Sequence, residues 1–399
     1  MADREDASAG RRSLLEETAE TPCGDDGLRH RRQAYRDAFP REGGALTSLS
    51  ILLDEGVRGH IFPGAAFAVG NARDTWFGFA GRQTYDPASC PVNERTLWDL
   101  ASVSKAVGTT SAAILLTGDG VLSLDAPVQG ACPQFGGAEI TVRDLLLHRS
   151  GLPPYIDATD LHDRRELWQR ICRLGPAYER DTASVYSCVG FIVLQHVLER
   201  IAECPLDEFL HTRVFEPLGM TRTTYNPGAD LRPACAPTQR LPAWQRDLEN
   251  RRGLVRVQEE FVQGDVHDPL ACVMGGVSGN AGLFSTPSDL AVFLRALLEG
   301  SFVFASDARI AWTKQARADS SRAIGWDTKS PEGSSAGSLF SPGSFGHTGY
   351  TGTSVWVDPQ NKLFVALLTN RVHPDDDGME IASFRPRFHD EAFRFLTGV

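Results

Sequence analysis

Apolar residues recur at three- and four-residue steps shortly after residue 44, at Leu46, Leu49, Leu53 and Val57. This spacing places them on one face and predicts an amphipathic helix. Two short β-prone runs follow, at 64–69 and 74–79, with a turn between them, and they predict a hairpin. A helix followed by a β meander is therefore expected at the start of the folded region.

The middle of the chain is mostly helical in pattern, with Gly- and Pro-bearing turns between the apolar runs. The predicted helices are 104–118, 141–148, 187–202 and 206–215. A further helix is expected after Ser285 and Thr286, either of which can cap it, with Pro287 in its first turn.

Strand patterns return near the C-terminus, at 354–358 and 363–369, and a last amphipathic segment runs from about 390 to 396. Both ends of the chain are therefore expected to contribute sheet and flanking helices. Residues 1–43 are polar, with charged clusters, and are interpreted either as a loosely ordered or disordered leader or as an appended helix.

The charge pattern bears on the kind of partner. The 399 residues include 40 Lys and Arg against 51 Asp and Glu, a net charge of −11. No basic stripe with interleaved aromatic residues occurs, so no nucleic-acid partner is expected.

No segment approaches the ~20 apolar residues that a membrane span needs. The expected partner is a small-molecule ester or amide substrate, and the oligomeric state stays open.

Eight cysteines occur without a C-x-x-C pair or a nearby histidine that would suggest a metal site. They are interpreted as free, mostly buried thiols. The N-terminal residues contain no apolar stretch long enough for a secretory signal. Together these features predict a cytoplasmic location, because reducing compartments keep thiols free.

The sharpest local feature is Ser102-x-x-Lys105, at the start of an apolar helical run. Positions three apart share a helix face, so these two residues are expected to be neighbours, with Ser104 rotated away. A serine hydroxyl becomes a good nucleophile when a base takes its proton, and a lysine can be that base if burial and nearby cations lower its pKa. The alternative interpretation is helix capping by Ser102 beside a solvated Lys105.

A second candidate is Tyr186, which immediately precedes the helix predicted at 187–202. Its hydroxyl could relay a proton or stabilise a charged Lys105. Taken alone, it is interpreted as a tyrosine at a helix entry with its hydroxyl bonded nearby.

A third candidate is His347-Thr348-Gly349-Tyr350, a glycine-containing lead into a strand. Glycine lets a substrate approach the backbone closely, and the N–H of Tyr350 could bind an oxyanion. Taken alone, the segment is a turn or a β-bulge.

Together these motifs resemble the serine hydrolases of the class C β-lactamase and penicillin-binding protein family, esterase-type members included. The resemblance extends from about residue 45 to 397, nearly everything except the leader. The segments that carry it are 61–66, 122–128, 140–153, 215–220, 275–286 and 346–354.

The resemblance implies a β-lactamase-like α/β fold, with an antiparallel sheet flanked by helices plus an all-helical lobe. Within a hydrolase domain at 44–399, the α/β lobe would come from about 44–100 and 285–399. The mainly helical lobe would come from about 101–284, and the site would lie where the lobes meet.

The resemblance also implies an acyl-enzyme mechanism that needs no metal or cofactor. By matching motifs, Ser102 is the nucleophile, Lys105 its base and Tyr186 the group that shuttles protons. The backbone N–H groups of Ser102 and Tyr350 would form the oxyanion hole. The substrate-binding residues implied in the same way are Cys188, His347, Thr348 and Gly349.

Two departures from the family pattern bear on substrate choice. Cys188 stands where antibiotic-processing members usually have Asn, and it lacks the amide's donor and acceptor. Alternatively, this thiol is core packing. His347 stands where those members have Lys, and a mostly neutral histidine would anchor a carboxylate less strongly. Both departures favour an esterase or an acyl-transferring enzyme.

Two further histidines invite a catalytic-triad interpretation. His148 is interpreted instead as a structural histidine at a helix end, and His267-Asp268 as a pair that orders a loop, because Lys105 already supplies a base.

The resulting hypothesis is an intracellular carboxylic-ester hydrolase acting through Ser102. The alternatives are an acyltransferase that passes the acyl group to an alcohol or amine, a β-lactamase or D-amino-acid peptidase, and a non-catalytic binding or assembly protein.

Overall fold

The computed structural model describes residues 45–137, 139–251, 260–301, 312–313, 316–317, 320–376 and 378–399. The described residues belong to one compact unit, Arg41–Val399. The leader predicted at 1–43 lies outside the described residues, so that prediction and the predicted lobe boundaries stay predictions.

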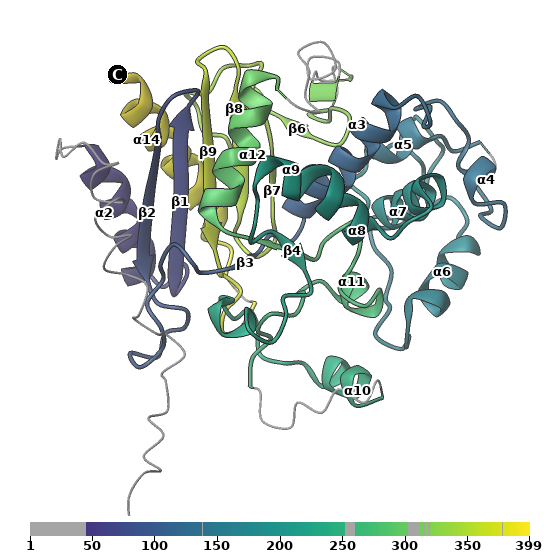
Figure 1. Ribbon diagram of the computed structural model, residues 1–399, viewed down its shortest axis with the longest axis horizontal. Helices are drawn as coiled ribbons and strands as arrows, with labels where there is room; N and C mark the ends of the chain where they lie inside the picture. The colour runs from purple at the N-terminus through teal and green to yellow at the C-terminus, as the bar shows by residue number, and fades with distance from the viewer. Residues whose placement is uncertain are drawn as a thin grey trace, which may run out of the picture. The chain divides into compact units, whose positions relative to one another are not determined.

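A six-stranded antiparallel sheet forms one side of the unit (Figure 1), in the order β2-β1-β9-β8-β7-β6. The strands are β1 (Gly64–Asn71), β2 (Thr75–Gly81), β6 (Asp327–Thr328), β7 (Phe345–Thr348), β8 (Ser354–Asp358) and β9 (Leu363–Thr369). The hairpin predicted from the two β-prone runs is confirmed, and so are the two late strands. Strands from both ends of the chain meet because β1 pairs with β9.

Side chains alternate between the two faces of the sheet. Along β1, Ala65, Phe67 and Val69 belong to one core, and Ala66 and Ala68 belong to another on the opposite face. This is the period of two that a strand buried on both sides requires. The second core continues into the helical part of the unit.

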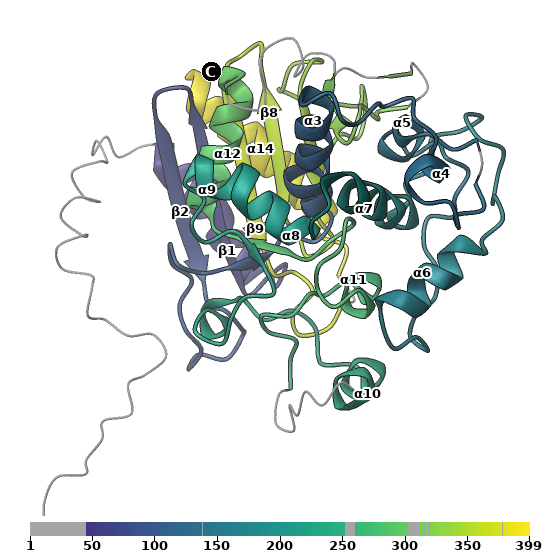
Figure 2. The ribbon, with the colours of Figure 1, turned by 45° about the vertical axis from the view of Figure 1, so that its right-hand side comes forward.

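Three helices cover this sheet: α2 (Ala45–Arg58), α12 (Pro287–Glu299) and α14 (Ile381–Thr397). Helices α2 and α14 pack together on one face, and α12 packs on the other (Figures 1 and 2). The predicted N-terminal helix is confirmed, and Thr286 caps α12 as expected, accepting a hydrogen bond from the Asp289 N–H. The last helix begins nine residues earlier than the amphipathic pattern indicated, because Phe384 and Phe388 bury on the sheet around Pro386.

The remaining helices lie beyond the other face of the sheet, with α4 and α6 far from β1 and β2 in both views (Figures 1 and 2). Two predicted helices are interrupted by wider π-helical turns. The elements are η1 (Lys105–Thr110), α3 (Ser111–Gly118), α4 (Val128–Ala131), α5 (Val142–Leu146), α6 (Arg164–Cys172), α7 (Cys188–Ala202), α8 (Leu206–Leu210), η2 (His211–Phe215), α9 (Glu216–Leu218), η3 (Arg232–Ala234), α10 (Ala243–Arg251) and α11 (Pro269–Val273). The predicted fold class, an antiparallel sheet flanked by helices with a helical part beside it, is confirmed.

A second, three-stranded sheet was not predicted. Its strands are β3 (Trp98–Asp99), β4 (Thr224–Tyr225) and β5 (Leu283–Ser285), in the order β3-β5-β4. Strands of two or three residues are too short for a hydrophobic period to show in the sequence. This sheet holds β3 against β5 just before Ser102.

The cysteines depart from their predicted state at one position. The thiols that are not disulfide-bonded include those of Cys132, Cys172, Cys188, Cys204 and Cys235. Cys90 is disulfide-bonded, so the interpretation as a free thiol is wrong there, because pairing depends on proximity in space rather than on spacing in sequence. A disulfide belongs to oxidising surroundings, so one argument for a cytoplasmic location is withdrawn, and that location stays a prediction.

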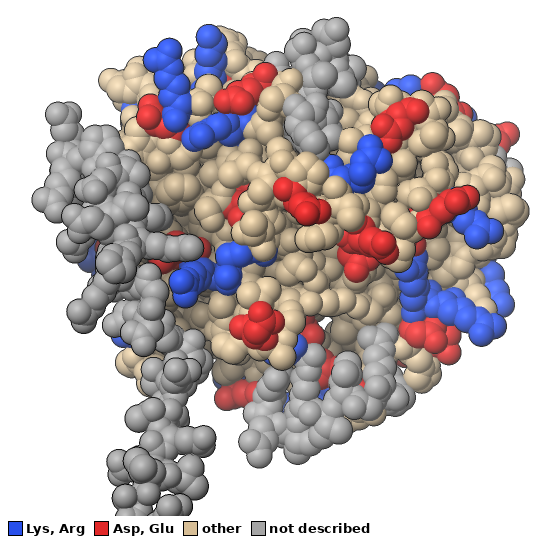
Figure 3. Space-filling view, viewed as in Figure 1, with Lys and Arg blue, Asp and Glu red and all other residues tan. Residues whose placement is uncertain are grey.

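Acidic and basic side chains are interspersed on the described part of the face seen in Figure 3. Among the described residues, no helix combines the length and the apolar character that crossing a membrane requires.

Candidate active site

Ser102 and Lys105 lie next to each other at the end of the turn that follows β3. The Nζ atom of Lys105 is 3.1 Å from Ser102 Oγ, so the predicted proximity is observed. Ser102 is partly exposed and Lys105 is buried. Ser104 points elsewhere, and its Oγ accepts a hydrogen bond from the Leu283 N–H at 3.1 Å. Ser102 is therefore the accessible serine of the pair.

The residue before Ser102 is held in an unusual conformation. Ala101 has a φ of +46°, which costs roughly 1–2 kcal/mol for an L-residue. The buried Asp99 carboxylate holds this turn by accepting hydrogen bonds from the N–H groups of Ala101 (2.8 Å) and His267 (2.7 Å). Burial raises the pKa of Asp99 to about 6. Strain of this kind is typical of functional sites.

The amine of Lys105 has three polar neighbours. Besides Ser102 Oγ, Nζ lies 2.8 Å from the Asn280 carbonyl oxygen and 3.4 Å from Cys188 Sγ. An ammonium can donate to all three groups. A neutral amine can donate to Asn280 and Cys188 and accept the proton of Ser102. Both protonation states therefore fit this geometry.

The pKa of Lys105 differs in direction from the expectation. Burial lowers it, but the acidic groups Cys188, Tyr186 and Asp268 together raise the pKa by more, so the net shift is upward. The lowering by burial and nearby cations that would favour a lysine base is therefore not found, because the neighbours are acidic groups. Lys105 rests as an ammonium at neutral pH and must lose a proton before it can act as a base.

Tyr186 meets Lys105 from the second helix, as predicted. Lys105 Nζ is 4.8 Å from the centre of its ring. Its hydroxyl oxygen is buried and has no partner in full hydrogen-bonding geometry among the described residues, but Lys105 and Ser102 lie close enough to interact with it. Burial raises the pKa of Tyr186, while Lys105 and Ser102 oppose that shift. A buried, unsatisfied hydroxyl costs about 1–3 kcal/mol and points to a functional role.

His148 supports the Tyr186 side chain. Their ring centres are 4.6 Å apart, and His148 Nδ1 accepts a hydrogen bond from the Ser187 N–H at 3.0 Å. Burial, with the charge of Arg322, holds the pKa of His148 well below its ordinary value. The histidine therefore stays neutral at the end of α5, as the structural interpretation predicts.

The pair His267-Asp268 also orders a loop. Asp268 Oδ1 caps α11 by accepting the Ala271 N–H at 2.9 Å, and it accepts the Asn280 side-chain amide at 3.0 Å. This bond helps to hold Asn280, whose carbonyl oxygen accepts from Lys105.

The turn after β7 lies against the segment that precedes Ser102. Thr351 Oγ1 donates to the Asp99 carbonyl at 2.7 Å, and Thr353 Oγ1 donates to the Leu100 carbonyl at 2.9 Å. A Cβ atom on Gly349 would lie 2.4 Å from the Leu100 oxygen. Glycine is therefore required where the two segments approach each other.

The two proposed oxyanion donors are the backbone N–H groups of Ser102 and Tyr350. Neither the Ser102 N–H nor the Tyr350 N–H donates a hydrogen bond to a described group. Their role as an oxyanion hole stays a prediction that this geometry permits.

Comparison with known proteins identifies the family of this chain. The family model described as Beta-lactamase matches residues 50–385. The chain belongs to the β-lactamase family.

Relatives within this family carry different names. A "Putative D-alanyl-D-alanine carboxypeptidase" of Escherichia coli K12 is 30% identical over 309 residues, 70% of each chain. An "N-acetylmuramyl-L-alanine amidase" of Bacillus subtilis 168 is 32% identical over 308 residues, covering 70% of this chain and 69% of the relative. The solved structure "EstCE1, a hydrolase with promiscuous acyltransferase activity" is 18% identical, with a TM-score of 0.68 over 88% of this chain and 98% of that one. The last likeness shows the fold alone.

His347, at the position where antibiotic-processing family members have lysine, is uncharged. Its Nδ1 bonds to the Thr348 carbonyl oxygen at 2.8 Å. Burial, aided by the charges of Arg322 and Lys105, lowers the pKa of His347 to about 3. A pKa this low agrees with the neutral histidine expected from the sequence.

Sequence reasoning missed Arg322. Its guanidinium carbon lies 5.0 Å from the centre of the Tyr186 ring, and its charge lowers the pKa of both His148 and His347. No motif surrounds Arg322 in the sequence, so nothing local could have marked it. It places a cation beside the site of this β-lactamase-family chain.

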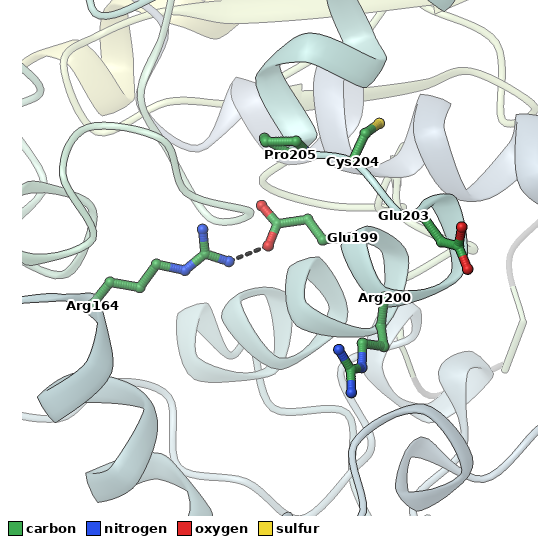
Figure 4. Close-up of a pocket in the computed structure, with 6 residues that line it drawn as sticks. All are labelled: Arg164, Glu199, Arg200, Glu203, Cys204 and Pro205. Atoms are coloured by element: carbon green, nitrogen blue, oxygen red, sulfur yellow. Dashed lines mark hydrogen bonds and ion pairs between the residues drawn. The ribbon is translucent and has the colours of Figure 1, made fainter.

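A surface hollow lies elsewhere, between α6 and the end of α7 (Figure 4), with a volume of about 560 Å³. Its lining residues are Arg164, Glu199, Arg200, Glu203, Cys204 and Pro205. Glu199, on α7, pairs with Arg164 of α6 and accepts a hydrogen bond from the Leu206 N–H of α8. These groups therefore hold the three helices together. Among the described residues, no cluster of His, Cys, Asp or Glu suits a metal ion.

Proposed function

We propose that this β-lactamase-family hydrolase cleaves carboxylic esters through an acyl-enzyme on Ser102. The observation that carries the proposal is the 3.1 Å contact between Ser102 Oγ and Lys105 Nζ. In the acylation step, Ser102 Oγ attacks the ester carbonyl carbon, and its proton passes to the neutral amine of Lys105. The N–H groups of Ser102 and Tyr350 would stabilise the resulting oxyanion.

Breakdown of the tetrahedral intermediate needs a proton for the leaving alcohol. The Tyr186 hydroxyl, which has no other described partner, would donate this proton and regain one from the Lys105 ammonium. In the second step a water molecule attacks the acyl-enzyme, gives a proton to the same pair of residues, and releases the carboxylic acid and Ser102.

The choice of esters over amides rests on two positions. Cys188 offers a thiol instead of an amide, so a substrate amide would lose a hydrogen-bonding partner there. His347 is neutral, so it would not form an ion pair with a substrate carboxylate.

A second candidate function is cleavage of a peptide that ends in a free carboxylate. Arg322 favours it, because its guanidinium lies beside Tyr186 and could pair with that carboxylate. The carboxypeptidase name of the relative in Escherichia coli points in the same direction.

The test is turnover of short-chain aryl esters against turnover of an acylated D-alanyl-D-alanine peptide. We expect the wild-type protein to release the phenol from the ester and to cleave the peptide more slowly. The Ser102→Ala variant should release no phenol. Faster peptide cleavage, lost in Arg322→Met, would replace the ester proposal by the second candidate. Repeating the ester assay with an added alcohol or amine separates hydrolysis from acyl transfer. A fluorophosphonate that does not label Ser102 would instead support a non-catalytic role.

A further inference from the structure

Arg385, on the C-terminal helix α14, contacts the turn that carries the Tyr350 N–H. Its Nη2 donates hydrogen bonds to the carbonyl oxygens of Gly349 and Thr353, the second at 3.1 Å. Its Nε is buried and has no hydrogen-bond partner in the described part of the chain. Among the described residues, Arg385 therefore donates its hydrogen bonds to backbone carbonyls at the two ends of this turn.

No carboxylate in the described part of the chain forms an ion pair with Arg385. Burial lowers its pKa to about 10, and the neighbouring charge that contributes is another cation, Arg371. At neutral pH the guanidinium is therefore charged. Burying a cation without a carboxylate partner is costly, and such costs are typical of functional sites.

The contact with Gly349 bears directly on the Tyr350 N–H. The Gly349 carbonyl and the Tyr350 N–H belong to one planar trans peptide group, so they point in opposite directions. The Gly349 oxygen also accepts from the Gly352 N–H at 3.1 Å. With its oxygen held by two donors, the peptide cannot rotate freely, and its N–H is fixed pointing away from Arg385.

Arg371 differs from Arg385 although it holds the next peptide group. Its Nε donates to the Tyr350 carbonyl at 2.8 Å, and it forms an ion pair with Asp376 at 2.9 Å. Its charge is thus balanced, and the carbonyl that it holds belongs to the peptide after the proposed oxyanion donor.

We propose that Arg385 is a positioning residue for the oxyanion hole, orienting the Gly349–Tyr350 peptide and polarising its N–H toward the reacting carbonyl oxygen. A cation on the carbonyl oxygen draws electron density from the amide and makes its N–H a stronger donor. This inference rests on the proposed ester hydrolysis at Ser102.

The test compares an aryl oxoester with the matching thionoester, whose sulfur is a poor acceptor in an oxyanion hole. In Arg385→Met, we expect kcat for the oxoester to fall about 10- to 100-fold, less than or comparable to the loss of a whole oxyanion donor. KM should change little, and the thionoester rate should fall much less. The ratio of oxoester to thionoester rates therefore falls. Arg385→Lys, which keeps the charge, should recover part of the ratio.

Arg387→Met is the matched control, because Arg387 lies on the same helix, is exposed, and pairs with Glu55 at the surface. It should leave the ratio unchanged. An unchanged ratio in Arg385→Met, or equal losses with both esters, would overturn the inference. If Arg385→Met does not fold, the oxoester-to-thionoester ratio of Arg385→Lys decides. A ratio equal to that of the wild-type protein would overturn the inference. A wild-type protein that hydrolyses neither ester contradicts the proposed function instead.

Discussion

The Nζ atom of Lys105 lies 3.4 Å from the Sγ atom of Cys188, which stands 83 residues later in the chain. This contact joins the proposed base to the position where the chain departs from the family pattern. A thiol is a weak donor and acceptor, so it satisfies the amine less well than an amide would. The same residue thus bears on both the protonation of Lys105 and the choice of substrate.

Replacing Cys188 should shift substrate preference. In Cys188→Asn, a side-chain amide becomes available to the substrate, and one hydrogen bond corresponds to up to about tenfold in rate. We expect kcat/KM for an anilide to rise relative to that for the matching aryl ester. Cys172→Asn, at a half-buried position on α6, is the control and should leave the ratio unchanged.

Ser102 and Ser104 should separate activity from stability. Ser102→Ala should lower kcat/KM for aryl esters by at least about 10³-fold, with little change in the free energy of unfolding because the side chain is partly exposed. Ser104→Ala should keep most activity and lose about 1–2 kcal/mol of stability, because the Leu283 N–H loses its acceptor. Ester assays and urea unfolding measure both. Equal activity losses would argue against Ser102 as the nucleophile.

Lys105→Met should abolish turnover while keeping the fold. Methionine fills nearly the same volume, but the Asn280 carbonyl loses its 2.8 Å donor, at a cost of about 1–3 kcal/mol. Fluorophosphonate labelling of Ser102 should slow in parallel with ester turnover. Labelling at the wild-type rate would show that another group activates the serine.

Tyr186→Phe should reduce activity without reducing stability. The hydroxyl is buried and has no partner in full hydrogen-bonding geometry among the described residues, so its removal should leave the free energy of unfolding unchanged or slightly higher. Loss of proton transfer should lower kcat by about 10²–10⁴-fold. Tyr225→Phe is the control, because its hydroxyl makes only a 3.4 Å contact with the Ser278 carbonyl. A stability loss in Tyr186→Phe that matches its activity loss would indicate a structural role.

The pH profile should rise toward alkaline pH. The pKa of Lys105 is raised, so log kcat/KM should climb by about one unit per pH unit while the free amine is the minor form. Below about pH 6, Asp99 also takes up a proton and releases the Ala101 turn, so the slope should steepen toward about two. His347, with a pKa of about 3, does not change the slope of the pH profile near pH 6.

Asp99→Asn provides the check on this assignment. The variant should be slower overall, because the side-chain amide cannot accept both backbone N–H groups, and it should lose the extra steepening near pH 6. A steepening that persists in Asp99→Asn would assign it to another group.

The helices and strands were largely predictable because their signals are local. The amphipathic period before β1, the hairpin turn and the Thr286 cap each depend on residues close together in sequence. The exceptions have equally physical causes. The three-stranded sheet is built from strands too short to show a period, and Pro386 obscured the first turns of α14.

The sequence by itself determined that Ser102 and Lys105 are neighbours, because three residues along a helical turn bring their side chains together whatever surrounds them. It also carried the family resemblance through its motifs. Only the tertiary structure decided the direction of the Lys105 pKa, the burial of the Tyr186 hydroxyl, the cation at Arg322 and the contact of Arg385 with Gly349. These properties arise from groups far apart in the chain whose burial and charge act only once the sheet and helices have packed together.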